Sequence, residues 1–189
     1  MTDSGHIANA EPTTTYTTAE GVVTYSQTET YALGAITRPE VMARAKTWVD
    51  EGVPYSMYVI HSSGWRADCS GFVSMAWNLS KPGLSTVTLP NVSHPISKDE
   101  LKPGDILLKG GPGTEGAAGH VRVFGDWLDG THSRYWVYEQ TPPKATYNEY
   151  TWNHTAAEYP PYRYNNIGEE RDDMAEVPQW QWDRLLSNA

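Results

Sequence analysis

The spacing of apolar side chains predicts an amphipathic helix over residues 37–52. The apolar positions on one face of this segment are Val41, Ala45, Trp48 and Val49. Thr37 and Glu40, three residues apart, are typical of a capping box at a helix N-terminus, and Gly52 is a helix stop signal. We therefore expect this helix to pack one face against a core.

A second helical segment, DCSGFVSMAWNLSKPG, covers residues 68–83 and is apolar on most sides. Its apolar positions are Phe72, Val73, Met75, Ala76 and Leu79. A helix that is apolar nearly all round is buried, and Pro82 with Gly83 is expected to end it. The pattern thus places Cys69 at the N-terminus of a buried helix.

Alternation with period two predicts strands in the second half of the chain. A Pro-Gly turn leads into a short strand over residues 105–109, and the glycine-rich stretch 110–119 is a loop that can bend closely around a ligand. Residues 120–127 and 133–140 alternate, and the LDGTH stretch between them is typical of a hairpin connection. Helices together with antiparallel strands indicate the α+β class.

The two ends of the chain differ in composition from the part between them. Residues 1–36 are rich in Thr and Ser, so we expect partial disorder, over roughly the first fifteen residues, and one short strand near Val23. Residues 161–189 combine Pro-Tyr turns, a run of charges and an amphipathic stretch around Trp182. We therefore predict an N-terminal extension, a catalytic domain at residues 37–160, and a C-terminal extension that packs on this domain.

Charge and hydropathy exclude several classes of partner. The formal net charge is -9, and no basic cluster is present that would release counterions from phosphates, so nucleic acid and anionic membrane are not expected as partners. The chain shows no basic start followed by an apolar run, and no stretch of about eighteen apolar residues that would span a membrane. A secreted protein whose leader has been removed would look the same. We expect a monomer.

Cys69 is the single cysteine of the chain, and one thiol cannot form an internal disulfide. It is a buried inert group, an intermolecular bridge or a reactive group. A free thiol, with a pKa of about 8.5, is mostly protonated at neutral pH. The first turn of a helix favours the thiolate, whereas the carboxylate of the adjacent Asp68 opposes it. Some other cation must therefore outweigh Asp68.

A histidine on a neighbouring strand would supply the base, and a third polar group would orient it. His120 opens the strand that follows the glycine-rich loop, and Glu139 and Gln140 end the partner strand. The start of one hairpin strand lies beside the end of the other, so these two residues are within reach of His120, whereas Asp126 at the turn is not. Because Glu139 and Gln140 point to opposite faces, only one can orient His120. We favour Glu139 and keep Gln140 as the substitute.

Several motifs together resemble those of the NlpC family of papain-like cell-wall cysteine peptidases. D-C-S-G-F-V at a helix start, L-K-P-G-D-I-L before a strand and G-H-V opening the next strand occur in the family order. The resemblance covers roughly residues 38–141. GVPYSM places Tyr55 where the family has a tyrosine beside its nucleophile, and Y-E-Q is similar to the Glu-bearing strand of the related CHAP amidases. The latter is a further reason to favour Glu139.

The resemblance implies a papain-like NlpC fold, with the nucleophile helix packed on a small antiparallel sheet and the active site between them. It also implies hydrolysis of an amide or isopeptide bond, in peptidoglycan stem peptides, through a thioester acyl-enzyme. Cys69 would attack the carbonyl, His120 would act as base and then acid, and Glu139 would orient His120. Tyr55 and the Cys69 backbone N–H would stabilise the oxyanion. No cofactor or metal is implied.

The resemblance further implies that Asp68 and Ser70 hold the free amino end of the substrate. It also implies a secreted or cell-wall location, although the sequence leaves the cytoplasm open. The scattered histidines lack the spacing of metal ligands; they are His6, His61, His94 and His154.

The chain departs from the family pattern at two points. The family spacing places the third polar residue at His132, but His132 lies in the predicted turn, so we rank it below Glu139. Residues 58–67 stand where the family has Gly-Gly, which predicts a remodelled substrate groove. Two other functions stay open: acyl transfer from the same thioester to an amine or hydroxyl, and a non-catalytic module that binds glycans or peptides.

Overall fold

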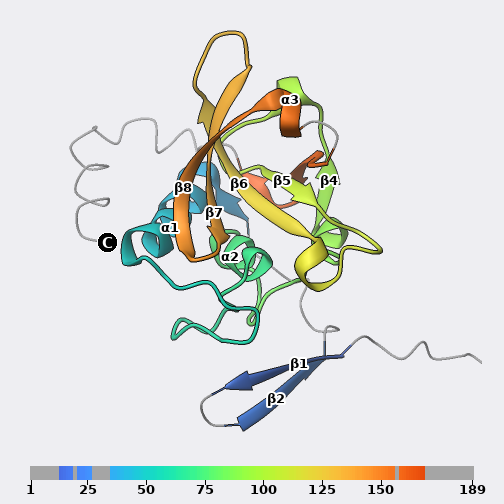
Figure 1. Ribbon diagram of the computed structural model, residues 1–189. Coiled ribbons are helices and arrows are strands. Elements are labelled where there is room, and N and C mark those ends of the chain that lie inside the picture. The colour runs from blue at the N-terminus through green and yellow to red at the C-terminus, as the bar shows by residue number, and fades with distance from the viewer. Residues whose placement is uncertain (1–12, 19–20, 27–34, 156–157, 169–189) are drawn as a thin grey trace, which may run out of the picture.

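The computed structural model describes residues 13–18, 21–26, 35–155 and 158–168 (Figure 1). The strands are β1 (Thr13–Thr18), β2 (Gly21–Ser26), β3 (Ile36–Thr37), β4 (Ser93–Pro95), β5 (Ile106–Lys109), β6 (His120–Trp127), β7 (Arg134–Thr141), β8 (Lys144–Thr151), β9 (Pro161–Tyr164) and β10 (Ile167–Gly168). The α-helices are α1 (Arg38–Glu51), α2 (Cys69–Ala76) and α3 (Trp152–Thr155). Short 3-10 helices cover Leu89–Val92, Lys98–Glu100 and Gly116–Ala118.

A six-stranded antiparallel sheet, in the order β4-β9-β5-β6-β7-β8, forms the centre of the fold. Helix α2 packs against β6 and β7, and α1 packs against α2, β7 and β8 (Figure 1). The β1–β2 hairpin and the parallel β3–β10 pair form separate small sheets. The predicted α+β class, with the Cys69 helix packed on an antiparallel sheet, is confirmed.

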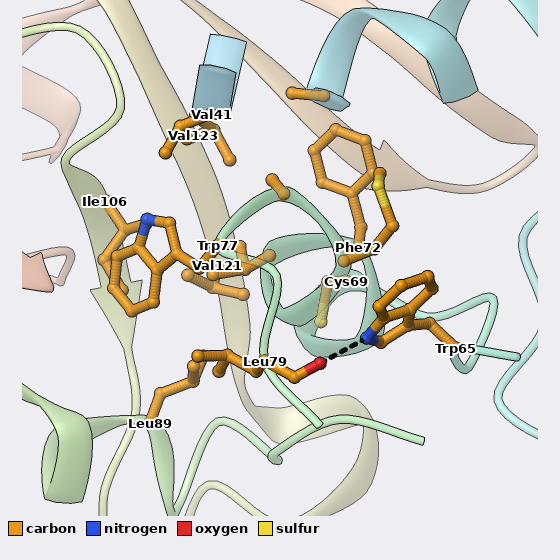
Figure 2. Packing of buried hydrophobic residues seen from close by; sticks show 14 of the residues in the cluster. Val41, Trp65, Cys69, Phe72, Trp77, Leu79, Leu89, Ile106, Val121 and Val123 are labelled. Carbon is orange, nitrogen blue, oxygen red and sulfur yellow. Dashed lines mark hydrogen bonds between the residues drawn. The ribbon is translucent and has the colours of Figure 1, made fainter. Parts of the chain in front are cut away.

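The sheet carries a different apolar cluster on each face. The register pairs Val123 with Tyr138 and Phe124 with Val137, so neighbouring positions alternate between the faces. Val121 and Val123 join the cluster of the two helices, and Figure 2 shows them among its residues. The opposite face carries a second cluster, whose buried members are Leu101, Leu107, Phe124, Tyr135 and Val137.

Helix α1 forms as its sequence predicts. The backbone N–H of Glu40 donates to the Thr37 hydroxyl (3.4 Å), and the backbone N–H of Thr37 donates to the Glu40 carboxylate (2.8 Å). This is the predicted capping box. Gly52 ends the helix in the left-handed conformation, with φ of 68°. The buried side chains of α1 include Val41 and Trp48.

Helix α2 is shorter than predicted, because it ends at Ala76 instead of continuing to Pro82. Asn78 adopts a left-handed conformation (φ 56°), which stops the helix. The backbone N–H of Leu79 then donates to the Ser74 carbonyl (2.8 Å), and the Trp65 indole donates to the Leu79 carbonyl (2.9 Å; Figure 2). The left-handed backbone of Asn78 thus ends the helix, which the apolar pattern alone predicts to continue to Pro82.

The chain ends contribute more strand than the pattern predicts. The strand expected near Val23 is β2, but its partner β1 reaches into the segment expected to be disordered. β9 lies inside the central sheet, although its residues fall in the predicted C-terminal extension. The expectations for residues 1–12 and for the stretch around Trp182 lie outside the described residues. No helix in the described part of the chain is long and apolar enough to cross a membrane.

Candidate active site

Cys69 occupies the first position of α2, as the sequence predicts. Asp68 is the N-cap, and its carboxylate accepts the backbone N–H of Gly71 at 2.6 Å. The Cys69 sulfur accepts hydrogen bonds from the backbone N–H groups of Ser70 and Val121. The bond from Val121 joins the start of α2 to the start of β6, one residue after His120.

The Cys69 thiol is neutral in the free protein. Burial, together with the Asp68 carboxylate, raises the pKa of Cys69 to about 12, although the two N–H donors and the Arg66 guanidinium act in the opposite direction. Only 7% of the residue is exposed. Burial therefore outweighs the N-terminus of the helix, contrary to the expectation that this position favours the thiolate.

Arg66 is a cation that pairs with the Asp68 carboxylate next to Cys69. Its Nε donates to Asp68 (2.9 Å), and its Nη2 donates to the Ser70 hydroxyl (2.9 Å), which in turn donates to Asp68 (3.1 Å). Arg66 and Ser70 are buried, whereas Asp68 is half-buried. Both predicted substrate-binding residues thus belong to one network with a cation that sequence reasoning missed. Their role toward a substrate stays a prediction.

His120 opens β6 and is held by Glu139. The imidazole Nε2 lies 2.6 Å from Glu139 Oε2, which also accepts from Arg122 Nε at 3.2 Å. The other carboxylate oxygen accepts from Asn148 (2.7 Å) and from the Tyr150 hydroxyl (2.6 Å). Glu139 is thus a buried carboxylate with four hydrogen-bond donors around it.

Glu139 is ionised in spite of its burial. Burial raises its pKa, but the hydrogen bonds from His120, Tyr150 and Asn148 and the charge of Arg122 lower it to about 2 overall. At neutral pH the carboxylate is therefore an acceptor only, and His120 donates its Nε2–H to it. Nδ1 is then the imidazole nitrogen that remains to take up a proton.

The Cys69 sulfur lies beside the backbone of Val121, the residue that follows His120 at the start of β6. His120 and Glu139 point to the sheet face opposite α2, while Val121 points toward α2. The pairing of β6 with β7 begins at Val123. The Val121 N–H, which donates a hydrogen bond to the sulfur, therefore lies before this pairing. The predicted site between α2 and the sheet would thus include the start of β6, and its position stays a prediction. Among the described residues, no hydrogen bond joins the sulfur to the imidazole.

The two alternatives to Glu139 lie elsewhere. Gln140 is buried on the α2 face, where its amide donates to the Val53 carbonyl at 3.1 Å. His132 lies in the turn between β6 and β7, where its ring stacks on Trp127 at 4.6 Å between centroids. The structure thus brings Glu139 to His120 and places Gln140 and His132 away from it. The catalytic roles themselves stay predictions.

Tyr55 lies close enough to the nucleophile to interact with it electrostatically. Burial, and then electrostatic interaction with Cys69 and with the Asp68 carboxylate, raise the pKa of Tyr55 to about 12. Its hydroxyl therefore stays protonated and can donate a hydrogen bond. Its backbone N–H donates to the Pro143 carbonyl at 3.0 Å, which ties the segment to the β7–β8 turn.

Residues 58–67 form a folded loop beside Tyr55. The backbone N–H of Ala67 donates to the Val59 carbonyl (3.0 Å), and Ile60 and Arg66 form an isolated antiparallel β-bridge. Tyr58 and Val59 are exposed on this loop, at 74% and 51%. Tyr58 also contributes to the raised pKa of Tyr55, so the exposed ring is near the site.

Comparison with known proteins gives a distant likeness of fold. No protein-family model and no curated protein matches the chain. Among solved structures, it is similar to an NlpC/P60 family protein from Bacillus cereus ATCC 10987, with 15% identity, a TM-score of 0.48, and coverage of 78% of this chain and 46% of that one. A Staphylococcus aureus subsp. aureus Mu50 protein, described as similar to a lipoprotein of the NLP/P60 family, gives 19% identity, a TM-score of 0.49, and coverage of 76% and 45%.

The chain is distantly similar in structure to NlpC/P60 family proteins. It spans less than half the length of either of these two structures. The likeness concerns the arrangement of helices and strands, and says nothing of activity.

Proposed function

We propose that the chain is a cysteine hydrolase that cleaves an amide or isopeptide bond through a thioester acyl-enzyme. One observation supports this proposal most directly. The Cys69 sulfur, at the N-terminus of α2, accepts a hydrogen bond from the backbone N–H of Val121, the residue after His120. The imidazole of His120 is held at 2.6 Å by the buried carboxylate of Glu139. A thiol, an imidazole and an orienting group are the three parts that nucleophilic catalysis by cysteine requires.

The reaction begins with a neutral thiol. As the sulfur of Cys69 attacks the carbonyl carbon, His120 Nδ1 takes the thiol proton, and Glu139 keeps the ring oriented through its hydrogen bond with Nε2. The tetrahedral oxyanion accepts hydrogen bonds from the Cys69 backbone N–H and from the Tyr55 hydroxyl, a type of contribution typically worth about 100 to 1000-fold in rate. His120 then gives its proton to the leaving amine, and a thioester remains. Water, deprotonated by His120, hydrolyses the thioester and restores the thiol.

Peptidoglycan stem peptide is the proposed substrate, on the strength of the D-C-S-G-F-V and G-H-V motifs in the sequence. The half-buried Asp68 carboxylate, beside the nucleophile, would hold the free amino end of such a peptide. This substrate places the protein outside the cell or in the cell wall.

The test is a digest of purified cell walls, with the released muropeptides identified by mass spectrometry. The wild type should release cleaved stem peptides, and Cys69→Ala should release none. His94→Gln is a matched control, because this exposed histidine bonds Asn165 away from the site. Full cleavage by Cys69→Ala would reject the proposed function. Ligated products in place of hydrolysed ones would select acyl transfer.

A second candidate is a non-catalytic module that binds cell-wall peptides or glycans, and the burial of the thiol favours it. In that case the wild type would leave cell walls intact but would sediment with them. Cys69→Ala would then sediment equally well, because no step of binding would need the sulfur.

A further inference from the structure

The side chain of Arg122 is held by two aromatic rings and by the carboxylate of Glu139. Its guanidinium carbon lies 3.9 Å from the centre of the Tyr150 ring and 4.1 Å from that of Tyr159, so the cation is enclosed between two aromatic rings. Its Nε donates to Glu139 Oε2 at 3.2 Å. This is the same oxygen that contacts His120.

We propose that Arg122 balances the charge of Glu139, so that the carboxylate orients His120 without holding the imidazole in its protonated form. Arg122 is then a positioning residue that acts through Glu139. This inference rests on the proposed function for its catalytic meaning, because only a neutral imidazole can take the proton of Cys69.

The physical reason is the sign of the charges around the imidazole. A lone carboxylate in contact with an imidazole favours the imidazolium, and an imidazolium cannot act as a base. Arg122 places a permanent positive charge beside Glu139 Oε2, the oxygen that contacts His120. The other oxygen, Oε1, accepts hydrogen bonds from the neutral side chains of Asn148 and Tyr150. The Glu139–Arg122 pair therefore presents His120 with a hydrogen-bond acceptor of no net charge.

The other charged groups around the site are already paired. On β5, Lys109 is the cross-strand partner of His120 and forms an ion pair with Glu158 at 3.0 Å. On the side of α2, Asp68 is paired with Arg66 at 2.9 Å. Burial raises the pKa of Tyr150, so its hydroxyl is neutral, and the Tyr159 ring lies edge-on to that of His120, 6.2 Å between centroids. Arg122 is thus the group whose removal changes the charge balance of Glu139 most directly.

The test follows the titration of the His120 ring by NMR in five proteins, with the signal assigned by its loss in His120→Gln. Relative to the wild type, Arg122→Gln should shift the midpoint upward by about one pH unit, and Glu139→Gln should shift it downward. The double variant removes both charges, so its midpoint should return to within a few tenths of a unit of the wild type. Arg122→Lys, which keeps the charge, should stay closer to the wild type than Arg122→Gln.

An unchanged midpoint in Arg122→Gln, with a shifted one in Glu139→Gln, would overturn the inference and leave Arg122 a structural residue. If the unpaired carboxylate prevents Arg122→Gln from folding, the double variant is compared with Glu139→Gln. Removing Arg122 should still raise the midpoint there, and no rise would overturn the inference. The titration needs no substrate. A wild type that leaves cell walls intact would therefore reject the proposed function without altering this result.

Discussion

At the scale of single residues, two buried groups respond to burial in opposite ways. Burial and Asp68 leave Cys69 neutral, because the hydrogen bonds and the cation near the sulfur are too weak to offset them. Glu139 is buried as well, but four donors keep it ionised. The number and charge of the donors therefore decide which group carries charge in the free protein.

The neutral thiol makes a prediction for the reactivity of Cys69. At pH 7 its alkylation by iodoacetamide should be at least about tenfold slower than that of glutathione, because a thiol with an ordinary pKa holds more thiolate at this pH. The rate is measured by intact-protein mass spectrometry, with Cys69→Ala as the unlabelled control. Rapid alkylation already at pH 6 would show a stable thiolate and contradict the neutral state.

The ionised Glu139 makes a prediction for stability in acid. Its pKa is lower in the folded protein than in the unfolded chain, so the stabilisation is complete above the unfolded value and is lost as the pH falls toward 2. For this buried group the loss is on the order of 3 kcal/mol. Urea unfolding between pH 6 and pH 2.5 should show a steeper acid-induced loss in the wild type than in Glu139→Gln. Equal losses would contradict the assignment.

At the scale of elements, the start of α2 depends on a close approach between two backbone segments. A Cβ atom added at Gly71 would lie 2.0 Å from the Arg66 carbonyl oxygen, so this position has no room for a side chain. The same approach brings the Arg66 guanidinium to Asp68 and Ser70. The position of the nucleophile is therefore coupled to the fit of Gly71 against the preceding loop.

Gly71→Ala should therefore destabilise the protein by about 2 kcal/mol or more, since backbone must move to relieve the overlap. Gly130→Ala is the matched control, because no atom lies within 4 Å of its added Cβ. Its effect should stay within about 0.5 kcal/mol, as for other exposed positions. Thermal and urea unfolding measure both. A stability of Gly71→Ala equal to that of Gly130→Ala would contradict the close approach.

Local patterns predicted the elements that carry Cys69, His120 and Glu139, because caps, apolar periodicity and hairpin turns are local in sequence. They could not predict the end of α2, which depends on the left-handed Asn78. They also missed β8, in which half of the residues are exposed and which lacks a strong apolar alternation. Asn148, on that strand, was therefore invisible as a partner of Glu139. Arg122 could have been found, since it lies two positions after His120 on the same face of β6.

At the scale of the whole molecule, the site joins two layers of the fold. α2 supplies the sulfur from the helical side of the sheet, while β6, β7 and β8 supply the imidazole and its partners on the opposite face. The Cys69 sulfur lies beside the Val121 backbone, one residue after His120 and before the pairing of β6 with β7 begins at Val123.

The measurement that most directly tests the pairing of Cys69 with His120 is the initial rate of peptide release from purified cell walls. It compares the wild type with His120→Gln and with His132→Asn, which keeps a residue that tolerates the left-handed turn conformation (φ 55°). His120→Gln should be slower by at least about 100-fold, as expected for loss of a general base, and His132→Asn should keep the wild-type rate. Equal rates for the wild type and His120→Gln would contradict a catalytic pair at the end of β6.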